Sequence, residues 1–205
     1  MKNTWDIFFE RNIRKIFADK KNILDIGGGL RISKEKNNRF DPSRTWIIPL
    51  LKGVEYLIMD PVPDYHPDII GDIHAMPFKD NSLDAIICIA VLEHVENPFV
   101  AMKEMYRTLK PGGYCFIYVP FLYYYHAEVG YYADYWRFSK DALKLLTKDF
   151  KTVEIQSVRG AIGTLLRLSP LGRSARLEKI AAWLDRIFKK DLSNQVSGFN
   201  VFLVK

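Results

Sequence analysis

The sequence is poor in cysteine and contains no long apolar run, and each absence excludes a class of protein. Cys88 and Cys115 are the two cysteines among 205 residues, and each lies inside an apolar stretch. Their number and spacing fit neither a disulfide framework nor a metal cluster. No stretch approaches the ~18 apolar residues of a membrane-spanning helix, and the N-terminus lacks a signal-peptide core. We therefore expect a cytoplasmic protein with no metal.

Repeats and low-complexity tracts are also missing. The apolar share of 48% and the charged share of 26% are ordinary for a globular protein. A chain of this length suits one domain, so we assign residues 1–205 to a single unit.

The net charge of +6 is placed unevenly. Residues 1–150 hold 20 basic and 20 acidic residues, whereas residues 151–205 hold 10 basic and 4 acidic residues. This asymmetry indicates either an anionic partner surface, such as a membrane or nucleic acid, or a solvated basic face.

Short apolar runs alternate with helical patterns along the chain. Asn97-Pro98 and Ser139 are helix start signals, and alternation of this kind predicts an α/β fold with a mostly parallel sheet covered on both faces. The runs expected to form strands are Asn22–Ile26, Tyr56–Met59, Leu83–Ile89, Tyr114–Val119, Thr152–Val158 and Phe199–Val204.

Helical segments are expected at both ends of the chain. Residues 1–20 hold an amphipathic lead-in helix, and residues 160–197 hold a basic helical insertion before the last strand. Between them, Ser43–Leu51 has the pattern of a short helix. The apolar stripe of the insertion either packs on its own domain or makes a peripheral membrane contact through residues 160–190. Its members are Leu177, Ile180, Ala181, Leu184, Ile187 and Phe188.

A glycine turn follows the first expected strand. The segment Asn22–Ile26 runs directly into Gly27, Gly28 and Gly29. Glycines permit positive φ angles and close approach of the backbone to a ligand, and open α/β sheets bind ligands beyond the carboxyl ends of their strands. By itself, the turn is equally compatible with a purely structural role.

Two further acids follow later strands. Asp60 ends the second expected strand, where its carboxylate can accept hydrogen bonds from both hydroxyls of a ribose, and Asp72 precedes the strand that begins at Leu83. Hydrogen bonds to a charged acceptor contribute ~1.5–3 kcal/mol each. No lysine-serine pair of a phosphate-binding loop follows the glycines, so the pattern favours a nucleoside over a polyphosphate.

These segments together resemble a known family. Residues from about Ile23 to Phe150 resemble the class I S-adenosylmethionine-dependent methyltransferases of the small-molecule type, of the methyltransferase domain 11 kind. The matching segments are LDIGGG, IMDP, GDIHAMPFKDNSLDAI, VLEHVENP and LKPGG. The resemblance implies a Rossmann-like, mostly parallel seven-stranded sheet with an antiparallel last strand, and S-adenosyl-L-methionine as cofactor. Arg31 departs from the family, which often has glycine there, so Arg31 itself is a candidate for the cofactor's carboxylate.

The resemblance assigns residues to the parts of the cofactor. The glycine turn and Asp25 would hold the methionine moiety, Asp60 the ribose, and Asp72 with the Ile73 N–H the adenine. Glu93 and His94 are interpreted as residues of either a helix surface or the site. The full set for the cofactor is Asp25, Gly27, Gly28, Gly29, Asp60, Asp72, Ile73, Ala90, Val91 and Leu92.

An aromatic loop is expected after the fifth strand. Six tyrosines fall within residues 120–138, and aromatic rings suit a sulfonium cation. Family members found beside glycan genes show a similar histidine followed by DYWRF, which implies His126 as general base and Asp134 as the residue that orients it; the alternative is that His126 is an ordinary hydrogen-bonded histidine. The candidates for substrate contact are Tyr125, Tyr135 and Arg137, and Arg137 either binds an anionic acceptor or pairs with Asp134.

The sequence thus predicts methyl transfer to a hydroxyl or amine of a small molecule, with a sugar or lipid-linked glycan as the candidate. No basic patch accompanies the cofactor region, so a nucleic acid is not expected as partner. Two alternatives remain: a non-catalytic or membrane-associated adaptor that keeps the fold, and a nicotinamide-dependent oxidoreductase. The turn reads G-G-G-L-R and Asp60 comes later than the usual ~20 residues, which disfavours the oxidoreductase.

Overall fold

Seven strands form one sheet in the computed structural model, which describes residues 2–33, 40–172 and 174–205. Their order across the sheet is β3-β2-β1-β4-β5-β7-β6. Strand β7 runs antiparallel to both β5 and β6, while the other neighbours pair in parallel. The strands are β1 (Asn22–Ile26), β2 (Glu55–Asp60), β3 (Ile69–Ile70), β4 (Leu83–Ile89), β5 (Leu109–Pro120), β6 (Thr152–Val158) and β7 (Gly198–Val204).

This architecture confirms the predicted Rossmann-like fold, including the antiparallel last strand. The sequence patterns predict the central strands well because β1 and β4 are buried along almost their whole length and therefore read as continuous apolar runs. The two-residue strand β3 escapes such patterns, since it is too short to show any.

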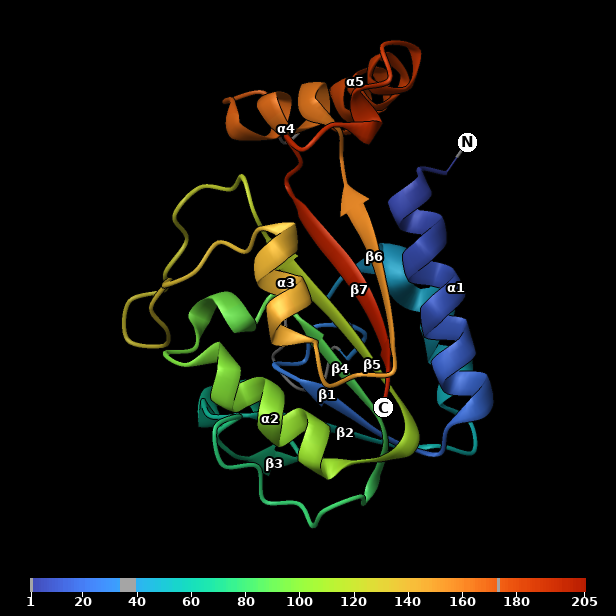
Figure 1. Ribbon diagram of the computed structural model, residues 1–205, viewed down its shortest axis with the longest axis vertical. Coiled ribbons are helices and arrows are strands. Elements are labelled where there is room, and N and C mark those ends of the chain that lie inside the picture. Colours follow the sequence, from blue (N-terminus) through green and yellow to red (C-terminus); the bar gives the residue numbers. More distant parts are fainter. Residues whose placement is uncertain (1, 34–39, 173) are drawn as a thin grey trace.

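Helices cover both faces of the sheet (Figure 1). Helix α1 (Thr4–Asp19) and the 3₁₀-helix η1 (Pro42–Leu51) bury one set of apolar side chains against the sheet, and α2 (Pro98–Thr108) and α3 (Lys140–Leu146) bury a second set on the opposite face. The short 3₁₀-helices η2 (Pro63–Tyr65) and η3 (Leu92–His94) follow β2 and β4.

Two predicted helix starts are confirmed by their capping hydrogen bonds. The Asn97 side chain accepts from the N–H groups of Phe99 and Val100, and the Ser139 hydroxyl oxygen accepts from the Ala142 N–H. The short helix expected at residues 43–51 is a 3₁₀-helix with Pro49 inside it.

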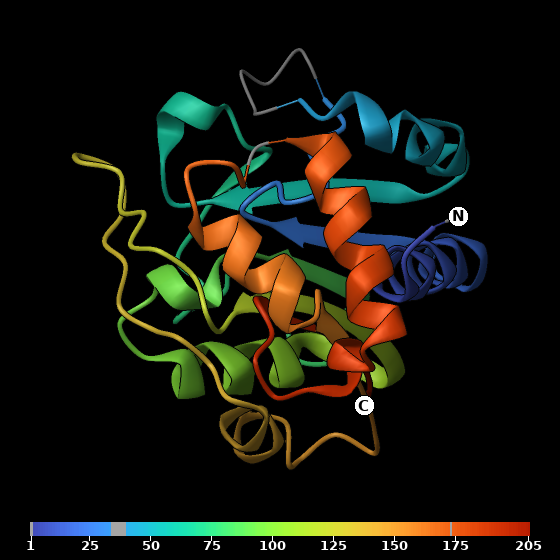
Figure 2. The same ribbon diagram turned by 90° about the horizontal axis from the view of Figure 1, so that it is seen from above.

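The basic insertion at residues 160–197 contains two α-helices and a short 3₁₀-helix. Helices α4 (Ala161–Leu168) and α5 (Ala175–Ile187) lie beyond the end of β6, above the carboxyl edge of the sheet (Figures 1 and 2), and η4 (Lys190–Leu192) follows them. Asp185 of α5 accepts hydrogen bonds from the N–H groups of Ile162 and Gly163 at the start of α4, which joins the pair. In the part of the chain that the structure describes, no helix has the length and apolarity to cross a membrane.

Candidate active site

The glycine turn that follows β1 is crowded from behind by the residues after β4. A Cβ on Gly27 would lie 2.6 Å from the Val91 Cγ2 atom, and a Cβ on Gly29 would lie 2.6 Å from the Ile89 Cβ atom. Gly27 and Gly28 also have φ angles of 75° and 57°, in the left-handed region. Only glycines fit this turn, and their bare backbone forms part of the wall of a cleft.

Asp25 lies fully buried beneath the turn. Its carboxylate accepts hydrogen bonds from the Gly29 and Leu30 N–H groups, each 3.0 Å long, and from the Tyr56 hydroxyl at 2.6 Å. Burial raises the pKa of Asp25 to about 6, while the Tyr56 hydroxyl opposes the increase. Asp25 therefore fixes the turn from below and acts on the cleft through its charge.

The turn's N–H groups are less available to a ligand than the sequence suggests. The Gly27 N–H donates to the Met59 carbonyl oxygen at 2.8 Å, and the Gly29 N–H donates to Asp25. The turn would therefore contact a ligand mainly through the exposed Cα atoms of its glycines, because the N–H groups of Gly27 and Gly29 already donate within the protein.

Asp60 ends β2 at the same edge of the sheet and lines the cleft. Its Oδ1 atom accepts from the Val62 N–H at 2.8 Å, which orients the carboxylate, and burial raises the pKa of Asp60. This is the position at which the sequence predicts a ribose contact.

Asp72 and Ile73 line the cleft beyond β3. The Asp72 Oδ1 atom accepts from the His74 N–H at 2.9 Å and lies 2.7 Å from the His74 Nδ1 atom, so Asp72 caps the turn that follows it. Its side chain is nevertheless 63% exposed, which leaves its carboxylate accessible from the cleft.

Of the residues that follow β4, some line the cleft and one is buried in the core. Ala90 has a φ of 56° and lines the cleft with Val91. The Leu92 side chain instead is fully buried in the core on the side of α2 and does not line the cleft, and its contact with the cofactor stays a prediction. Leu92 is the first residue of η3, and that turn directs its side chain inward.

Arg44 on η1 is a cleft residue that sequence reasoning misses. Its guanidinium donates to the Gly29 carbonyl oxygen and lies 5.0 Å from the centre of the Phe9 ring. Arg31, the candidate from the sequence, also lines the cleft and is exposed, with a φ of 55°. Two cations therefore border the turn, and the signal for Arg44 was hidden by the polar stretch that precedes it.

The aromatic loop between β5 and α3 is held by one ion pair. Arg137 donates to both oxygens of Asp134, at 2.6 and 2.7 Å, and to the carbonyl oxygens of Tyr123 and Tyr124. This pairing holds the pKa of Asp134 down at about 2. Of the two roles considered for Arg137, the structure has the pairing with Asp134, whose side chain has no exposed surface.

His126 is joined to the same pair. Its N–H donates to the Asp134 Oδ2 atom at 2.8 Å, and its Nδ1 atom lies 3.3 Å from that oxygen. The His126 side chain lines the cleft, as do those of Tyr125 and Tyr135, which are 74% and 51% exposed.

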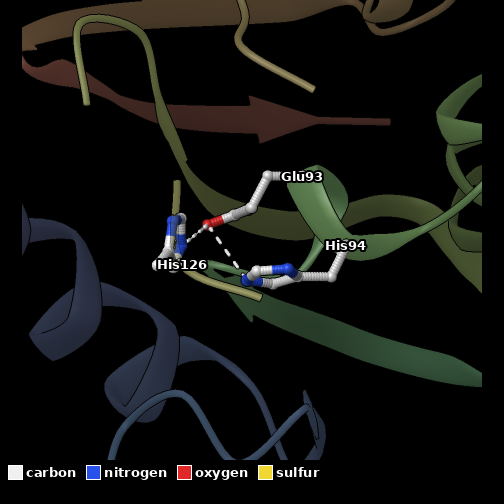
Figure 3. Close-up of side chains that lie close together, drawn as sticks. All are labelled: Glu93, His94 and His126. Atoms are coloured by element: carbon white, nitrogen blue, oxygen red, sulfur yellow. Dashed lines mark ion pairs between the residues drawn. The ribbon is translucent and has the colours of Figure 1, made fainter. Parts of the chain in front are cut away.

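Glu93 and His94 belong to the cleft rather than to a solvated helix surface (Figure 3). The Glu93 side chain is 1% exposed, and its Oε1 atom lies 3.8 Å from the His126 Nε2 atom and 3.9 Å from the His94 Nε2 atom. This carboxylate raises the pKa of His126. The signal in the sequence is the Glu-His pair directly after one strand, followed by a histidine after the next strand.

One cleft of about 1670 Å³ at the carboxyl edge of the sheet brings most of the predicted residues together. Five of the predicted residues do not line it: Asp25, Gly28, Leu92, Asp134 and Arg137. The predicted residues that line it are Gly27, Gly29, Asp60, Asp72, Ile73, Ala90, Val91, Tyr125, His126 and Tyr135.

Comparison with known proteins agrees with this geometry. Residues 58–117 match a methyltransferase domain family. A tRNA U34 carboxymethyltransferase of Nautilia profundicola is 29% identical over 53% of this chain and 38% of its own length, and a demethylmenaquinone methyltransferase of Renibacterium salmoninarum is 49% identical over 22% of this chain and 19% of its own. The chain thus spans well under half the length of these relatives.

Solved structures match over nearly the whole chain. A SAM-dependent methyltransferase from Archaeoglobus fulgidus has a TM-score of 0.60 at 16% identity, covering 98% of this chain and 94% of that one. An S-adenosylmethionine-dependent methyltransferase from Mesorhizobium loti has a TM-score of 0.57 at 14% identity, covering 95% and 96%. The match of residues 58–117 to a methyltransferase domain, and a fold shared with S-adenosylmethionine-dependent methyltransferases, both support the resemblance seen in the sequence.

Proposed function

We propose that this protein transfers a methyl group from S-adenosyl-L-methionine to a hydroxyl or amine of a small molecule, with a sugar or lipid-linked glycan as the candidate acceptor. One observation carries the proposal: a single cleft is lined by the glycine turn, by Asp60 and by the aromatic loop around His126. Cofactor and acceptor would therefore meet at one edge of the sheet.

The residues present fit the cofactor. Gly27 and Gly29 line the cleft without side chains of their own, and the buried Asp25 carboxylate places negative charge beneath them. Asp60 has one carboxylate oxygen fixed by the Val62 N–H, which presents the group to a diol. The cofactor supplies a methyl group on a positively charged sulfur, and the negative charge of the cleft favours such a cation.

The chain's contribution to the reaction is chiefly alignment. Well-oriented intramolecular reactions gain ~7–11 kcal/mol from position alone, and the loop that holds His126 is fixed by the Arg137–Asp134 pair. Its Nε2 atom faces the cleft, where a base that removes an acceptor proton would add about 100- to 10,000-fold. We keep His126 and Asp134 as the proposed catalytic pair, with Asp134 as the orienting member.

We further propose that α4 and α5 bring the cleft to an anionic membrane. Large apolar side chains on these helices stand in water, among them Leu165 at 70%, Trp183 at 60% and Ile187 at 53% exposure. Lys179 and Arg186 lie on the same helix α5, and basic charge beside exposed apolar groups is complementary to an anionic lipid surface. A lipid-linked acceptor would then reach the cleft from the membrane.

A transfer assay tests the proposal. The full chain is incubated with S-adenosylmethionine carrying a tritiated methyl group and with lipid-linked glycan extracts, and label in the extract is counted together with S-adenosylhomocysteine formed. We expect equal amounts of both. Asp60→Asn should lower transfer at limiting cofactor by about 10- to 100-fold, because a hydrogen bond to a charged acceptor contributes ~1.5–3 kcal/mol. The control Asp141→Asn changes an exposed carboxylate on α3. Cofactor binding without transfer to any extract would favour the adaptor.

A further inference from the structure

Three electron-pair donors converge on one point of the cleft wall. They are the Glu93 carboxylate, which follows β4, and the side chains of His94 and His126, which come from η3 and from the aromatic loop (Figure 3). One ligand atom from each lies within 4.8 Å of the other two. The two shorter separations, 3.8 and 3.9 Å, join the Glu93 Oε1 atom to the two Nε2 atoms.

In each histidine, the contact of the Nδ1 atom with a backbone carbonyl oxygen determines which ring nitrogen has a free lone pair. The His94 Nδ1 atom lies 2.6 Å from the Ala133 carbonyl oxygen, and the His126 Nδ1 atom lies 3.1 Å from the Tyr124 carbonyl oxygen. A carbonyl oxygen only accepts, and the Asp134 Oδ2 atom 3.3 Å from the His126 Nδ1 atom is a second acceptor, which outweighs the Arg137 Nη2 atom at 3.5 Å. We therefore place the proton of each neutral ring on Nδ1, so that each Nε2 atom keeps its lone pair. This is the outer-shell arrangement that metal-binding histidines use.

The Glu93 carboxylate is buried, and one of its two oxygen atoms has no hydrogen-bond partner among the described residues. Its side chain is 1% exposed, and its Oε2 atom accepts no hydrogen bond from any described residue. The nearby guanidinium of Arg137 is held by Asp134 and by loop carbonyl oxygens. The Oε2 atom of this buried carboxylate accepts no hydrogen bond, and its Oε1 atom faces two imidazoles at 3.8 and 3.9 Å, so a cation between the three groups would compensate its burial.

We propose that Glu93, His94 and His126 bind a divalent transition-metal ion. Two imidazoles and one carboxylate suit zinc, iron, cobalt, nickel or manganese, whereas magnesium and calcium prefer sites built of oxygen. Two ligand atoms at ~2.1 Å from one tetrahedral ion are roughly 3.4 Å apart. The two separations from Glu93 need to close by about half an ångström, and the third, which is at most 4.8 Å, by up to about 1.4 Å, through rotation of the side-chain χ angles.

Such a site changes how the acceptor is held. Three protein ligands leave coordination positions open to the cleft, and an oxygen of the acceptor can occupy one of them. The ion would then use the Nε2 atom that a general base also needs, and it favours a hydroxyl acceptor over an amine. This consequence rests on the proposed methyl transfer, whereas metal binding itself does not.

Metal binding is measured directly on untagged full-length protein stripped with a chelator. Titration calorimetry with Zn²⁺ and visible absorption with Co²⁺ should each give one site per chain. Glu93→Gln and His126→Asn should each weaken binding at least tenfold, since each removes one of three ligands. His66→Asn is the matched control, because His66 lies outside the cluster and is already in a left-handed conformation that asparagine accepts.

S-adenosylhomocysteine binding is measured on every variant to show that the fold persists. One site that is lost in Glu93→Gln and His126→Asn but kept in His66→Asn establishes the proposal. Absence of a stoichiometric site in the wild-type protein, or equal binding in all four proteins, overturns it. Metal binding without S-adenosylhomocysteine binding would instead contradict the proposed function while leaving the metal site intact.

Discussion

The Tyr56 hydroxyl donates a 2.6 Å hydrogen bond to the Asp25 carboxylate beneath the glycine turn. Because the two residues end and begin neighbouring strands of the sheet, this bond ties β2 to the floor of the cleft. It also supports the charged form of a carboxylate whose burial raises its pKa to about 6.

Cofactor binding should therefore depend on pH through Asp25. A cationic ligand favours the charged carboxylate, so affinity is full above the Asp25 pKa of about 6 and falls by up to about tenfold per pH unit below it. Tyr56→Phe removes a bond that lowers the pKa, which moves the fall to higher pH. Titrations of S-adenosylmethionine between pH 5 and 8 measure this. Superimposable curves for both proteins would contradict it, because Tyr56 contacts Asp25 and not Asp60.

Stability of the free protein should show the opposite pH trend at Asp25. The folded pKa of about 6 lies above the ordinary aspartate value of 3.8, so the folded state binds the proton more tightly than the unfolded chain. The stabilisation that Asp25 contributes through this proton is fully present below pH 3.8 and is lost as the pH rises through 6. Asp25→Asn should remove that loss, as chemical denaturation at pH 4.5 and 7 would reveal. An unchanged difference between the two pH values would contradict the assignment.

Helix α4 should depend on Asp185. Asp185→Asn replaces a carboxylate that accepts from two N–H groups, so we expect a loss of about 2 kcal/mol, since hydrogen bonds to charged groups contribute ~1.5–3 kcal/mol each. Hydrogen exchange at Ile162 and Gly163, with thermal unfolding, checks this. The matched control is Asp149→Asn in an exposed turn, and equal exchange in both variants would count against the capping role.

Membrane contact should depend on the exposed apolar residues of α4 and α5. Replacing Leu165 and Trp183 with glutamine should reduce flotation with vesicles that contain anionic lipid severalfold, and added salt should weaken it further. Leu145→Gln on α3 removes an equally exposed leucine from another surface. If all three proteins float alike, α4 and α5 do not form the membrane contact.

Arg137 should act on the acceptor loop and not on cofactor affinity. Arg137→Lys loses the two-pronged contact with Asp134, so hydrogen exchange in residues 121–138 should rise and methyl transfer should fall about tenfold or more. Affinity for S-adenosylhomocysteine should stay within twofold of the wild type. Arg11→Lys, in an exposed pair with Glu154, is the control. A loss of cofactor affinity in Arg137→Lys alone would show that the loop also shapes the cofactor half of the cleft.

The parts of the molecule predicted best from sequence are those fixed by local pattern. Buried parallel strands read as apolar runs, and Asn97 and Ser139 mark helix starts through bonds within four residues. Gly27 and Asp60 were found because each follows a strand, and strand ends of a parallel sheet meet at one edge.

The parts missed depend on contacts distant in the sequence. Arg44 reaches Gly29 across a stretch without regular pattern, and Tyr56 reaches Asp25 across two strands. The meeting of Glu93 with His126 requires knowing how the aromatic loop folds back over η3. The burial of the Leu92 side chain could not be predicted either, because a 3₁₀-helix of three residues is too short to show a pattern in the sequence.

Calorimetric titration of the purified full chain with S-adenosylhomocysteine and with NADH tests directly whether the cleft binds S-adenosylmethionine. We expect one site for S-adenosylhomocysteine, weakened about 10- to 100-fold by Asp60→Asn and unchanged by Asp141→Asn, with no heat from NADH. Saturable binding of NADH, or no binding of S-adenosylhomocysteine at millimolar concentration, would contradict it.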